Sequence, residues 1–408
     1  MTSIALLLVG DELLDGRTAD KNGAYFAGQL REHGVAVSRI TTIGDPLAGI
    51  VATIGDLLQA VDFVVISGGI GPTADDRTRE AVARFAGVDL VDDGVTWDEI
   101  VQRFEKLGRG APSEANRVQA LIPRGATRLP NPLGTAPGFV IKVGGKRVAS
   151  VPGVPSEARR MFDDHVLPLL STGSAIPQTT LLFAGVPESK LGHLLADEMV
   201  EREEVRVGIT ASWSVLAVTV RAADSALLES TCQRVRAIGA QWYVGAGARR
   251  IEQLLVERLR SDRLDLSLAE SCTGGLVASR ITGVPGASEV LQEAYVTYSN
   301  AAKQRLLAVP AEVLETHGAV SEACVLAMVR GLVDRSGAAL AGVVSGIAGP
   351  GGGSADKPVG LVHFAIARSG VPEAWSRQYG DIGREEVRQR AATDLLVRLT
   401  RATSQAGR

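Results

Sequence analysis

The chain has few of the residues that build disulfide frameworks, zinc sites and base-stacking surfaces. Its three cysteines, Cys232, Cys272 and Cys324, are far apart and show no Cys-x-x-Cys spacing. A disulfide framework or a zinc site is therefore not expected, and a reducing cytoplasm is the expected location. Aromatic residues make up only 4% of the chain, and the five histidines are isolated from one another. This composition disfavours a base-stacking platform and a histidine metal site.

A strong net charge and long apolar runs are also missing. The net charge of -3 provides no basic field that would attract nucleic acid. No apolar stretch reaches the length that spans a membrane. The apolar run near the N-terminus lacks a basic flank and is followed at once by Asp11 and Glu12, so we expect a first strand and not a signal peptide. We therefore expect neither nucleic acid nor a membrane among the partners.

The pattern along the 408 residues predicts an α/β protein with more than one domain. Residues 1–170 alternate apolar strands with helices, which is typical of a doubly wound domain. Residues 175–247 read as a small α+β module, and Gly245–Gly247 reads as a linker. Residues 249–408 again alternate strands and helices. The expected fold is two three-layer α/β/α domains joined by a small α+β module.

Two glycine-containing turns follow buried strands in the last third of the chain. Ala269–Gly275 comes after the apolar run 264–268, and Ser345–Gly353 comes after the run 340–344. The carboxyl ends of parallel strands are where open α/β folds hold ligands, and a helix N-terminus favours an anion. The turns therefore predict a small anionic ligand, a nucleotide. Two simpler interpretations remain open: Ser271 and Thr273 are N-caps only, and the second turn is a flexible loop.

A lysine near the start of a helix suggests a catalytic base. Asn300 is a suitable N-cap, which places Lys303 in the first helical turn, where its charge opposes the helix dipole. Burial and the positive helix end would both lower the pKa of this amine and make it a base. Ser288 is the candidate nucleophile, and Tyr298 would relay a proton. The alternatives are a solvated surface lysine and, for the nucleophile, Cys272 at the helix N-terminus.

Several blocks in this region occur in an order that resembles the signature of the nicotinamide-nucleotide amidase domain. They are Ala269–Gly275, Val296–Asn300, His317–Glu322, Ser345–Ser354 and Lys357–Gly360. The resemblance implies hydrolysis of the carboxamide of nicotinamide mononucleotide to nicotinate mononucleotide and ammonia, with no cofactor. It implies that Ser288 attacks the carboxamide carbon while Lys303, through Tyr298, takes the proton. An acyl-enzyme would form and then be hydrolysed.

The same turns are expected to bind the ribose and phosphate of the mononucleotide. The expected contacts are Glu270, Ser271, Thr273, Gly274, Ser345, Gly346 and Gly349. Arg384 and Arg388, at the start of the last helix, are expected to pair with the phosphate, or else are exposed helix charges. Backbone N–H groups of one of the glycine turns would form the oxyanion hole.

The first domain carries a second candidate site. Ser67–Thr78 resembles the glycine block of molybdopterin-binding proteins, and Asn131–Phe139 and Val151–Glu157 resemble downstream blocks of the CinA family. Backbone amides at Gly68, Gly69 and Gly71 are expected to cradle phosphate. A divalent metal ion is expected on a set of carboxylates. The expected ligands are Asp75 and Asp76, with Asp11 or Asp45; the simpler interpretation of Asp45 and Asp76 is helix capping.

The family resemblance implies hydrolysis of the pyrophosphate of ADP-ribose by this first domain, which leaves three interpretations open. The chain is a bifunctional enzyme acting on small nucleotides, or its first domain only binds a nucleotide, or it is a molybdopterin-handling protein. The order of elements in the middle module is similar to that of a K-homology fold. The resemblance also implies a homodimer.

Overall fold

The computed structural model describes residues 3–170, 176–248 and 250–403. The chain divides into two compact units between residues 176 and 177, and each is described by itself. The expected domain boundaries at residues 175 and 249 lie outside the described residues. Among the described helices, none combines the length and the apolar character needed to cross a bilayer.

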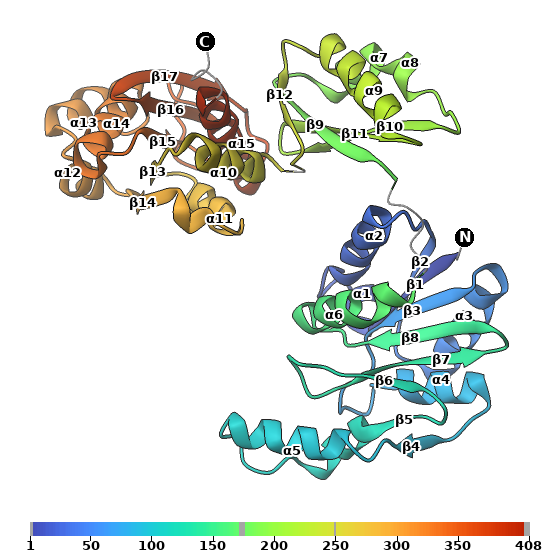
Figure 1. The fold of residues 1–408 in the computed structure, drawn as a ribbon. Coiled ribbons are helices and arrows are strands. Elements are labelled where there is room, and N and C mark those ends of the chain that lie inside the picture. The colour runs from blue at the N-terminus through green and yellow to red at the C-terminus, as the bar shows by residue number, and fades with distance from the viewer. Residues whose placement is uncertain (1–2, 171–175, 249, 404–408) are drawn as a thin grey trace. The chain divides into compact units, whose positions relative to one another are not determined.

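The first unit is built on a six-stranded sheet with the order β2-β1-β3-β8-β7-β6 (Figure 1). Its strands are β1 (Ile4–Val9), β2 (Val37–Ile43), β3 (Phe63–Ser67), β6 (Thr127–Leu129), β7 (Gly138–Val143) and β8 (Lys146–Val151). The first four strands of this order run parallel to one another. β7 is antiparallel to its neighbours β8 and β6. β1 and β3 are buried along their whole length, which explains their continuous apolar sequence.

Helices cover both faces of this sheet. The helices are α1 (Asp11–Leu14), α2 (Asn22–Glu32), α3 (Leu47–Ala60), α4 (Thr78–Ala86), α5 (Thr96–Lys106) and α6 (Pro155–Met161). Alternate residues of β1 belong to different cores: Leu7 packs with residues of α3 and α4, and Leu6 packs with residues of α2 and α6. A short antiparallel pair, β4 (Leu90–Asp92) and β5 (Leu121–Pro123), and the helical turns 114–120, 162–166 and 167–169 complete the unit.

Residues 178–246 form an antiparallel sheet with the order β10-β11-β9-β12, accompanied by helices α7–α9. The elements are β9 (Gln178–Ala184), α7 (Glu188–Leu194), α8 (Ala196–Met199), β10 (Val205–Ser212), β11 (Val215–Ala222), α9 (Ser225–Ile238) and β12 (Tyr243–Ala246). The interpretation of Gly245 as part of a linker is wrong, because this glycine lies in the edge strand β12. It sits at a bulge, where a Cβ would come within 2.5 Å of the Leu254 side chain.

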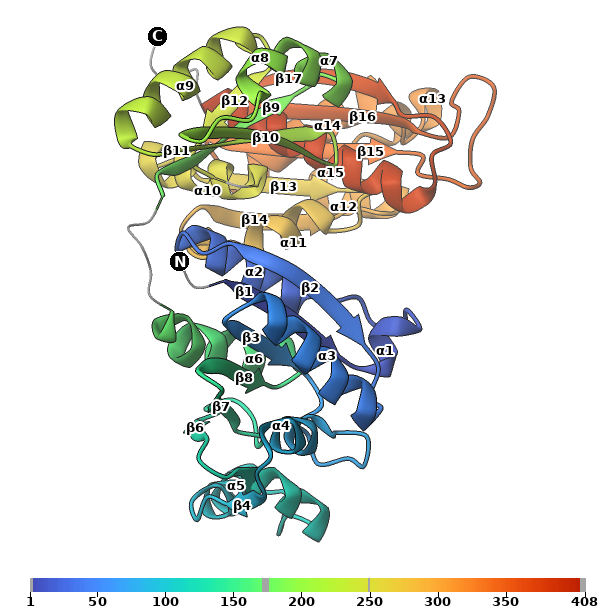
Figure 2. The same ribbon diagram turned by 90° about the vertical axis from the view of Figure 1, so that its right-hand side faces the viewer.

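The second α/β sheet has the order β14-β13-β15-β16-β17, which can be followed in Figure 2. Its strands are β13 (Leu266–Glu270), β14 (Leu291–Val296), β15 (Leu340–Gly346), β16 (Leu361–Arg368) and β17 (Val371–Gln378). β14, β13 and β15 run parallel to one another. β16 is antiparallel to its neighbours β15 and β17. The carboxyl ends of the three parallel strands therefore meet at one edge of the sheet.

Helices again cover both faces, so the expected three-layer α/β architecture is confirmed. The helices are α10 (Ile251–Asp262), α11 (Leu276–Thr282), α12 (Asn300–Leu307), α13 (Ala311–His317), α14 (Glu322–Ser336) and α15 (Arg384–Thr403), with a helical turn at Ala287–Glu289. Helices α12–α14 pack on one face through Leu307 and Met328, and α10, α11 and α15 pack on the other.

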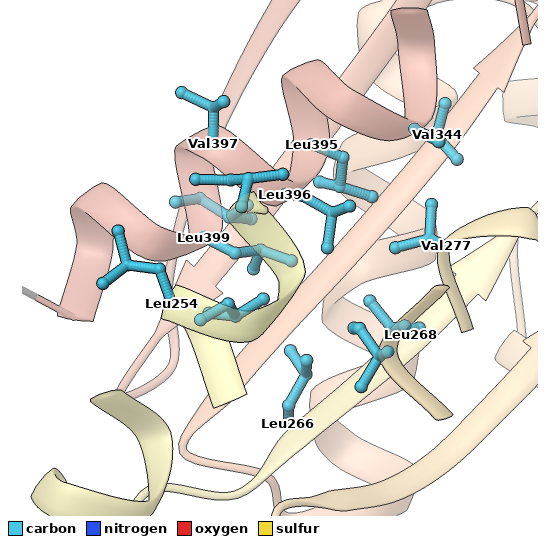
Figure 3. Close-up of a cluster of buried hydrophobic side chains, with 14 of the residues drawn as sticks. Leu254, Leu266, Leu268, Val277, Val344, Leu395, Leu396, Val397 and Leu399 are labelled. Atoms are coloured by element: carbon cyan, nitrogen blue, oxygen red, sulfur yellow. The ribbon is translucent and has the colours of Figure 1, made fainter. Parts of the chain in front are cut away.

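The larger core of this half fixes the elements on either side of the first glycine turn. Figure 3 shows Leu266 and Leu268 of β13 beneath Leu395 and Leu399 of α15, with Val277 of α11 beside them. Each such side chain contributes about 1.5–3 kcal/mol when it is fully buried. The turn that joins β13 to α11 therefore begins and ends on firmly packed elements.

Candidate active site

Glu270, the last residue of β13, shapes the turn that follows. Its buried carboxylate accepts hydrogen bonds from the N–H groups of Gly275 (3.0 Å), Val277 (3.1 Å) and Ala278 (2.8 Å). These donors at the start of α11 have no partner within the helix, so the carboxylate satisfies them. The prediction that Glu270 contacts substrate is therefore wrong, because its oxygens are used to hold the turn.

Ser271 and Lys303 meet at the carboxyl edge of the sheet. β13 and β14 are in parallel register with Glu270 opposite Val296, so the next residues, Ser271 and Thr297, lie side by side. α12 then returns over this edge, capped by the hydroxyl of Ser299 rather than by Asn300 as expected. The Lys303 Nζ atom lies 3.1 Å from Ser271 Oγ and 2.8 Å from the Thr297 carbonyl oxygen.

The environment of Lys303 favours the neutral amine. The side chain is only 1% exposed, and burial lowers its pKa below the usual lysine value. The thiols of Cys324 and Cys272 act weakly in the opposite direction. In the ranges that the structure describes, no carboxylate forms an ion pair with Nζ. Lys303 is therefore not a solvated surface lysine, and it is positioned to act as a base toward the Ser271 hydroxyl.

The neighbouring thiols are poor nucleophiles. Burial raises the pKa of Cys272 to about 12, although nearby backbone N–H groups and Lys303 favour the thiolate. Burial also raises the pKa of Cys324. Both side chains therefore remain protonated thiols at neutral pH, which disfavours the alternative of a Cys272 nucleophile although Cys272 lines the cleft over Lys303.

Ser288 lies at the other edge of the sheet. It is an exposed residue of the turn Ala287–Glu289, which comes before β14, whereas Lys303 follows β14. A strand of this length separates the two edges by roughly 20 Å. The prediction that Ser288 is the nucleophile paired with Lys303 is therefore wrong, because the two side chains share no cleft.

A cleft of about 210 Å³ opens over the Ser271–Lys303 pair. Its lining residues are Ser271, Cys272, Tyr298, Lys303, Ala319, Val320, Ser345, Gly346, Ala348 and Arg384. Arg384 donates to the Tyr298 hydroxyl (3.0 Å) and to the Gly349 carbonyl (2.9 Å). The structure thus brings Tyr298, Arg384, Ser345 and Gly346 together with Lys303, as the sequence predicted.

Several predicted substrate contacts form hydrogen bonds within the protein instead. Ser345 does line the cleft, but its hydroxyl donates to the Ala319 carbonyl (2.7 Å). The Thr273 side chain is fully buried, and its carbonyl accepts a hydrogen bond from Arg388 (3.0 Å). Arg388 also pairs with Glu385 (2.8 Å), so it braces the turn and is not among the lining residues, contrary to the prediction of a phosphate contact.

The remaining predicted glycines serve the turns through their backbone. Gly274 has a φ of +64°, a conformation that residues with a side chain rarely adopt. Gly349 contributes its carbonyl to the hydrogen bond with Arg384. Sequence reasoning missed Ser271 as the partner of Lys303, and it also missed the wall formed by Ala319 and Val320. Ser271 directly follows a buried strand and precedes a helix, and that position was the available signal.

The first unit has a cleft of about 470 Å³ at the carboxyl ends of β1, β3 and β8. The predicted glycines Gly68, Gly69 and Gly71 all line it. At Gly68, where φ is +102°, a Cβ would lie 2.2 Å from the Val9 carbonyl oxygen, so only glycine fits. Behind this turn the buried Arg79, which sequence reasoning missed, donates to the carbonyls of residues 70 and 71.

The four carboxylates predicted as metal ligands do not converge. Asp11 and Asp45 accept hydrogen bonds from each other's backbone N–H (3.2 and 3.1 Å), and Asp76 accepts one from the Thr73 N–H (2.9 Å). Asp45 and Asp76 therefore brace loops and do not cap helices. Within residues 3–170, 176–248 and 250–403, no group of three or more His, Cys, Asp or Glu side chains is arranged to hold a metal ion.

Carboxylates nevertheless gather around this cleft. Its lining includes Glu12, Asp45, Asp75, Asp76 and Glu157. Burial raises the pKa of Asp45, and the charges of Asp11, Glu12 and Asp75 raise it further. A hydrogen bond from Thr73 lowers the pKa of the exposed Asp75. The cleft thus combines anionic side chains with a glycine turn that is backed by a buried guanidinium.

Comparison with known proteins finds a matching family for each of the two α/β domains. The family described as CinA C-terminal domain matches residues 248–403, and the family described as probable molybdopterin binding domain matches residues 5–172. A CinA-like protein from Anaeromyxobacter dehalogenans is 41% identical over 96% of this chain and 98% of its own length. A CinA-like protein from Citrifermentans bemidjiense is 39% identical over 90% and 89% of the two chains. The crystal structure of competence/damage inducible protein CihA from Agrobacterium tumefaciens is 45% identical over 38% of this chain and 97% of its own, with a TM-score of 0.36.

Proposed function

The chain belongs to the CinA family, and on that premise we propose that its C-terminal α/β domain hydrolyses the carboxamide of nicotinamide mononucleotide. The products are nicotinate mononucleotide and ammonia. The observation that carries the proposal is the Lys303 amine, buried without a carboxylate partner and 3.1 Å from the Ser271 hydroxyl in a cleft. This is the arrangement of an activated serine nucleophile.

The reaction proceeds by acyl transfer. Ser271 Oγ attacks the carboxamide carbon while its proton moves to Lys303 Nζ, and the Thr297 carbonyl stabilises the resulting ammonium. Lys303 then returns the proton to the departing nitrogen, so that ammonia leaves and an ester to Ser271 remains. Water attacks this ester with Lys303 again as the base, which releases the carboxylic acid and regenerates the hydroxyl.

The turn after Ser271 also offers donors for the oxyanion. Among the described residues the N–H groups of Cys272 and Thr273 have no backbone carbonyl as acceptor, and both lie beside the Cys272 thiol. In a strand–turn–helix arrangement, the N–H of the residue after the nucleophile is a usual oxyanion donor. Each such donor lowers the barrier by roughly 3–4 kcal/mol.

The chemical test is to follow ammonia and nicotinate mononucleotide with the full chain. We expect release of ammonia from nicotinamide mononucleotide in equal amounts with the acid product, and much slower release from free nicotinamide, which lacks the ribose and phosphate. A chelator should leave the rate unchanged, since no step of the proposed reaction uses a metal. Failure to release ammonia from the mononucleotide would refute the amidase proposal.

Arg384 is the residue that we assign to the substrate phosphate. Its exposed guanidinium lies at the rim of the cleft. We expect Arg384→Met to raise KM for the mononucleotide by about 10- to 100-fold, the loss expected for charged hydrogen bonds, with a smaller effect on kcat. Nicotinamide riboside, which lacks the phosphate, is the matched control, and its kcat/KM should change little. Equal losses with both substrates would show that Arg384 acts only by holding Gly349 and Tyr298.

A second activity, hydrolysis of the pyrophosphate of ADP-ribose, is favoured for the N-terminal domain by the lining of its cleft. The glycine turn, backed by Arg79, suits a pyrophosphate. The scattered carboxylates do not form a closed cage for a metal ion. They do fit Mg²⁺ that arrives with the substrate, since this ion is usually held by one or two carboxylates together with phosphate oxygens and waters. Such an ion would neutralise charge on the phosphates, while Asp75 and Glu12 would orient it.

Removal of divalent metal should separate the two proposed activities. We expect a chelator to abolish hydrolysis of ADP-ribose and to leave ammonia release unchanged. Asp75→Asn should raise the Mg²⁺ concentration needed for half-maximal hydrolysis by about tenfold or more. Formation of AMP and ribose 5-phosphate from ADP-ribose and release of ammonia from the mononucleotide would be measured on the same preparation. Binding of ADP-ribose without any hydrolysis would support the interpretation of this domain as a binding module.

A further inference from the structure

A third cleft lies within the second unit, between the β10–β11 hairpin and the C-terminal α/β domain. It has a volume of about 320 Å³, which lies at the small end of the range for small-molecule sites. The residues that line it include Ser212, Trp213, Arg250, Glu252, Leu276 and Arg280. None of these residues lines the cleft over Ser271 and Lys303.

The hairpin that forms one wall has an unfavourable turn sequence. Ser212 pairs with Val215, so Trp213 and Ser214 alone make the turn, and both have a positive φ, +47° and +72°. Such two-residue turns strongly prefer Asn-Gly, because other residues are strained there. Trp213 is 40% exposed as a residue, so burial does not explain why tryptophan occupies this position. Strain of this kind is common at ligand-binding sites.

The opposite wall carries positive charge. Glu252 is almost fully buried and pairs with Arg280 at 2.8 Å and with Arg250 at 3.4 Å. Arg280 is also bound to the Thr393 hydroxyl (2.7 Å), so its guanidinium is held on two sides. Arg250 is mostly exposed, and among the described residues Glu252 is the only ion-pair partner of its guanidinium. Two guanidiniums against one carboxylate leave a net charge of about +1 beside the exposed indole.

We propose that this cleft binds a nucleotide, with its base stacked on Trp213 and its phosphate on Arg250. A flat base matches the indole face and an anion matches the free guanidinium. The cleft has room for one mononucleotide. The site is independent of the amidase chemistry, but it contacts Leu276 and Arg280 of α11, the helix that begins directly after the Ser271 turn. A bound nucleotide would therefore hold α11 and the hairpin together.

Tryptophan fluorescence of the full chain tests the site, with AMP as the probe. We expect saturable quenching at or below millimolar AMP, and loss of that quenching component in Trp213→Asn. Trp242→Phe, which changes a ring of the same module outside this cleft, is the matched control and should keep the quenching. Trp213→Asn should also unfold at the same or a higher temperature, because asparagine suits the turn. Ammonia release should stay at the wild-type rate.

A second variant separates recognition of the phosphate from that of the base. Arg250→Gln should weaken AMP binding by about tenfold or more and leave the binding of adenosine unchanged. The proposal is overturned if AMP does not quench, if Trp213→Asn quenches as the wild type does, or if Arg250→Gln binds AMP normally. If Trp213→Asn melts at a lower temperature, the Arg250→Gln result alone decides, since that variant leaves the turn unchanged.

Discussion

Replacing Ser271 by alanine should reduce kcat for ammonia release by at least about 10⁴-fold, the scale seen when the nucleophile of an acyl-transfer enzyme is removed. The change deletes one oxygen atom, and the backbone of the turn remains held by Glu270. KM should change little, because the rest of the cleft is intact. The measurement is steady-state ammonia release from nicotinamide mononucleotide by the full chain.

The matched control is Ser288→Ala, which removes the same atom from an exposed serine at the other edge of the sheet. Its kcat should equal that of the wild type. A covalent adduct, trapped by acid quenching and located by mass spectrometry, should lie on the peptide that contains Ser271. Loss of activity in Ser288→Ala with retention in Ser271→Ala would reverse the assignment.

The pairing of Ser288 with Lys303 failed for a reason that the sequence contains. Ser288 precedes the strand β14, and Lys303 follows it. In a parallel sheet, residues before and after one strand lie at opposite edges, so they cannot share a site. Ser271, which follows its own strand, lies at the same edge as Lys303. The direction of the strands therefore shows which of the two serines lies near Lys303. Closeness in the sequence favours Ser288, which is the wrong one.

The strands and helices around the site were accessible from the sequence because periodicity and buried runs specify them. The apolar run before Glu270 became β13, and the expected last helix begins at Arg384 as predicted. Side-chain roles were harder to predict, because the sequence does not distinguish a carboxylate that binds a ligand from one that accepts hydrogen bonds from the backbone. The carboxylates of Glu270 and Asp45 both accept hydrogen bonds from backbone N–H groups, and only the three-dimensional contacts show this.

Lys303→Met should abolish ammonia release to the same extent as Ser271→Ala, by about 10⁴-fold or more in kcat, because no other base among the described residues lies on the serine hydroxyl. Methionine fills nearly the same volume, so the core around α12 should stay packed. Lys303→Arg is the discriminating companion. Arginine retains a positive charge and does not deprotonate in proteins, so it too should be inactive if the neutral amine is the base. An active arginine variant would mean that charge alone suffices.

The pH dependence gives an independent test of the same lysine. Since the neutral amine is the active form, kcat/KM of the wild type should rise with pH through the pKa of Lys303, which burial places below the usual value of about 10.4. At pH values between the pKa of Lys303 in the folded chain and its pKa in the unfolded chain, the unfolded chain binds more protons. The free energy of unfolding should therefore rise with pH in that range. Lys303→Met should lack this rise and should be more stable than the wild type at the acidic end. Loss of activity in a variant that is more stable could then not be attributed to unfolding.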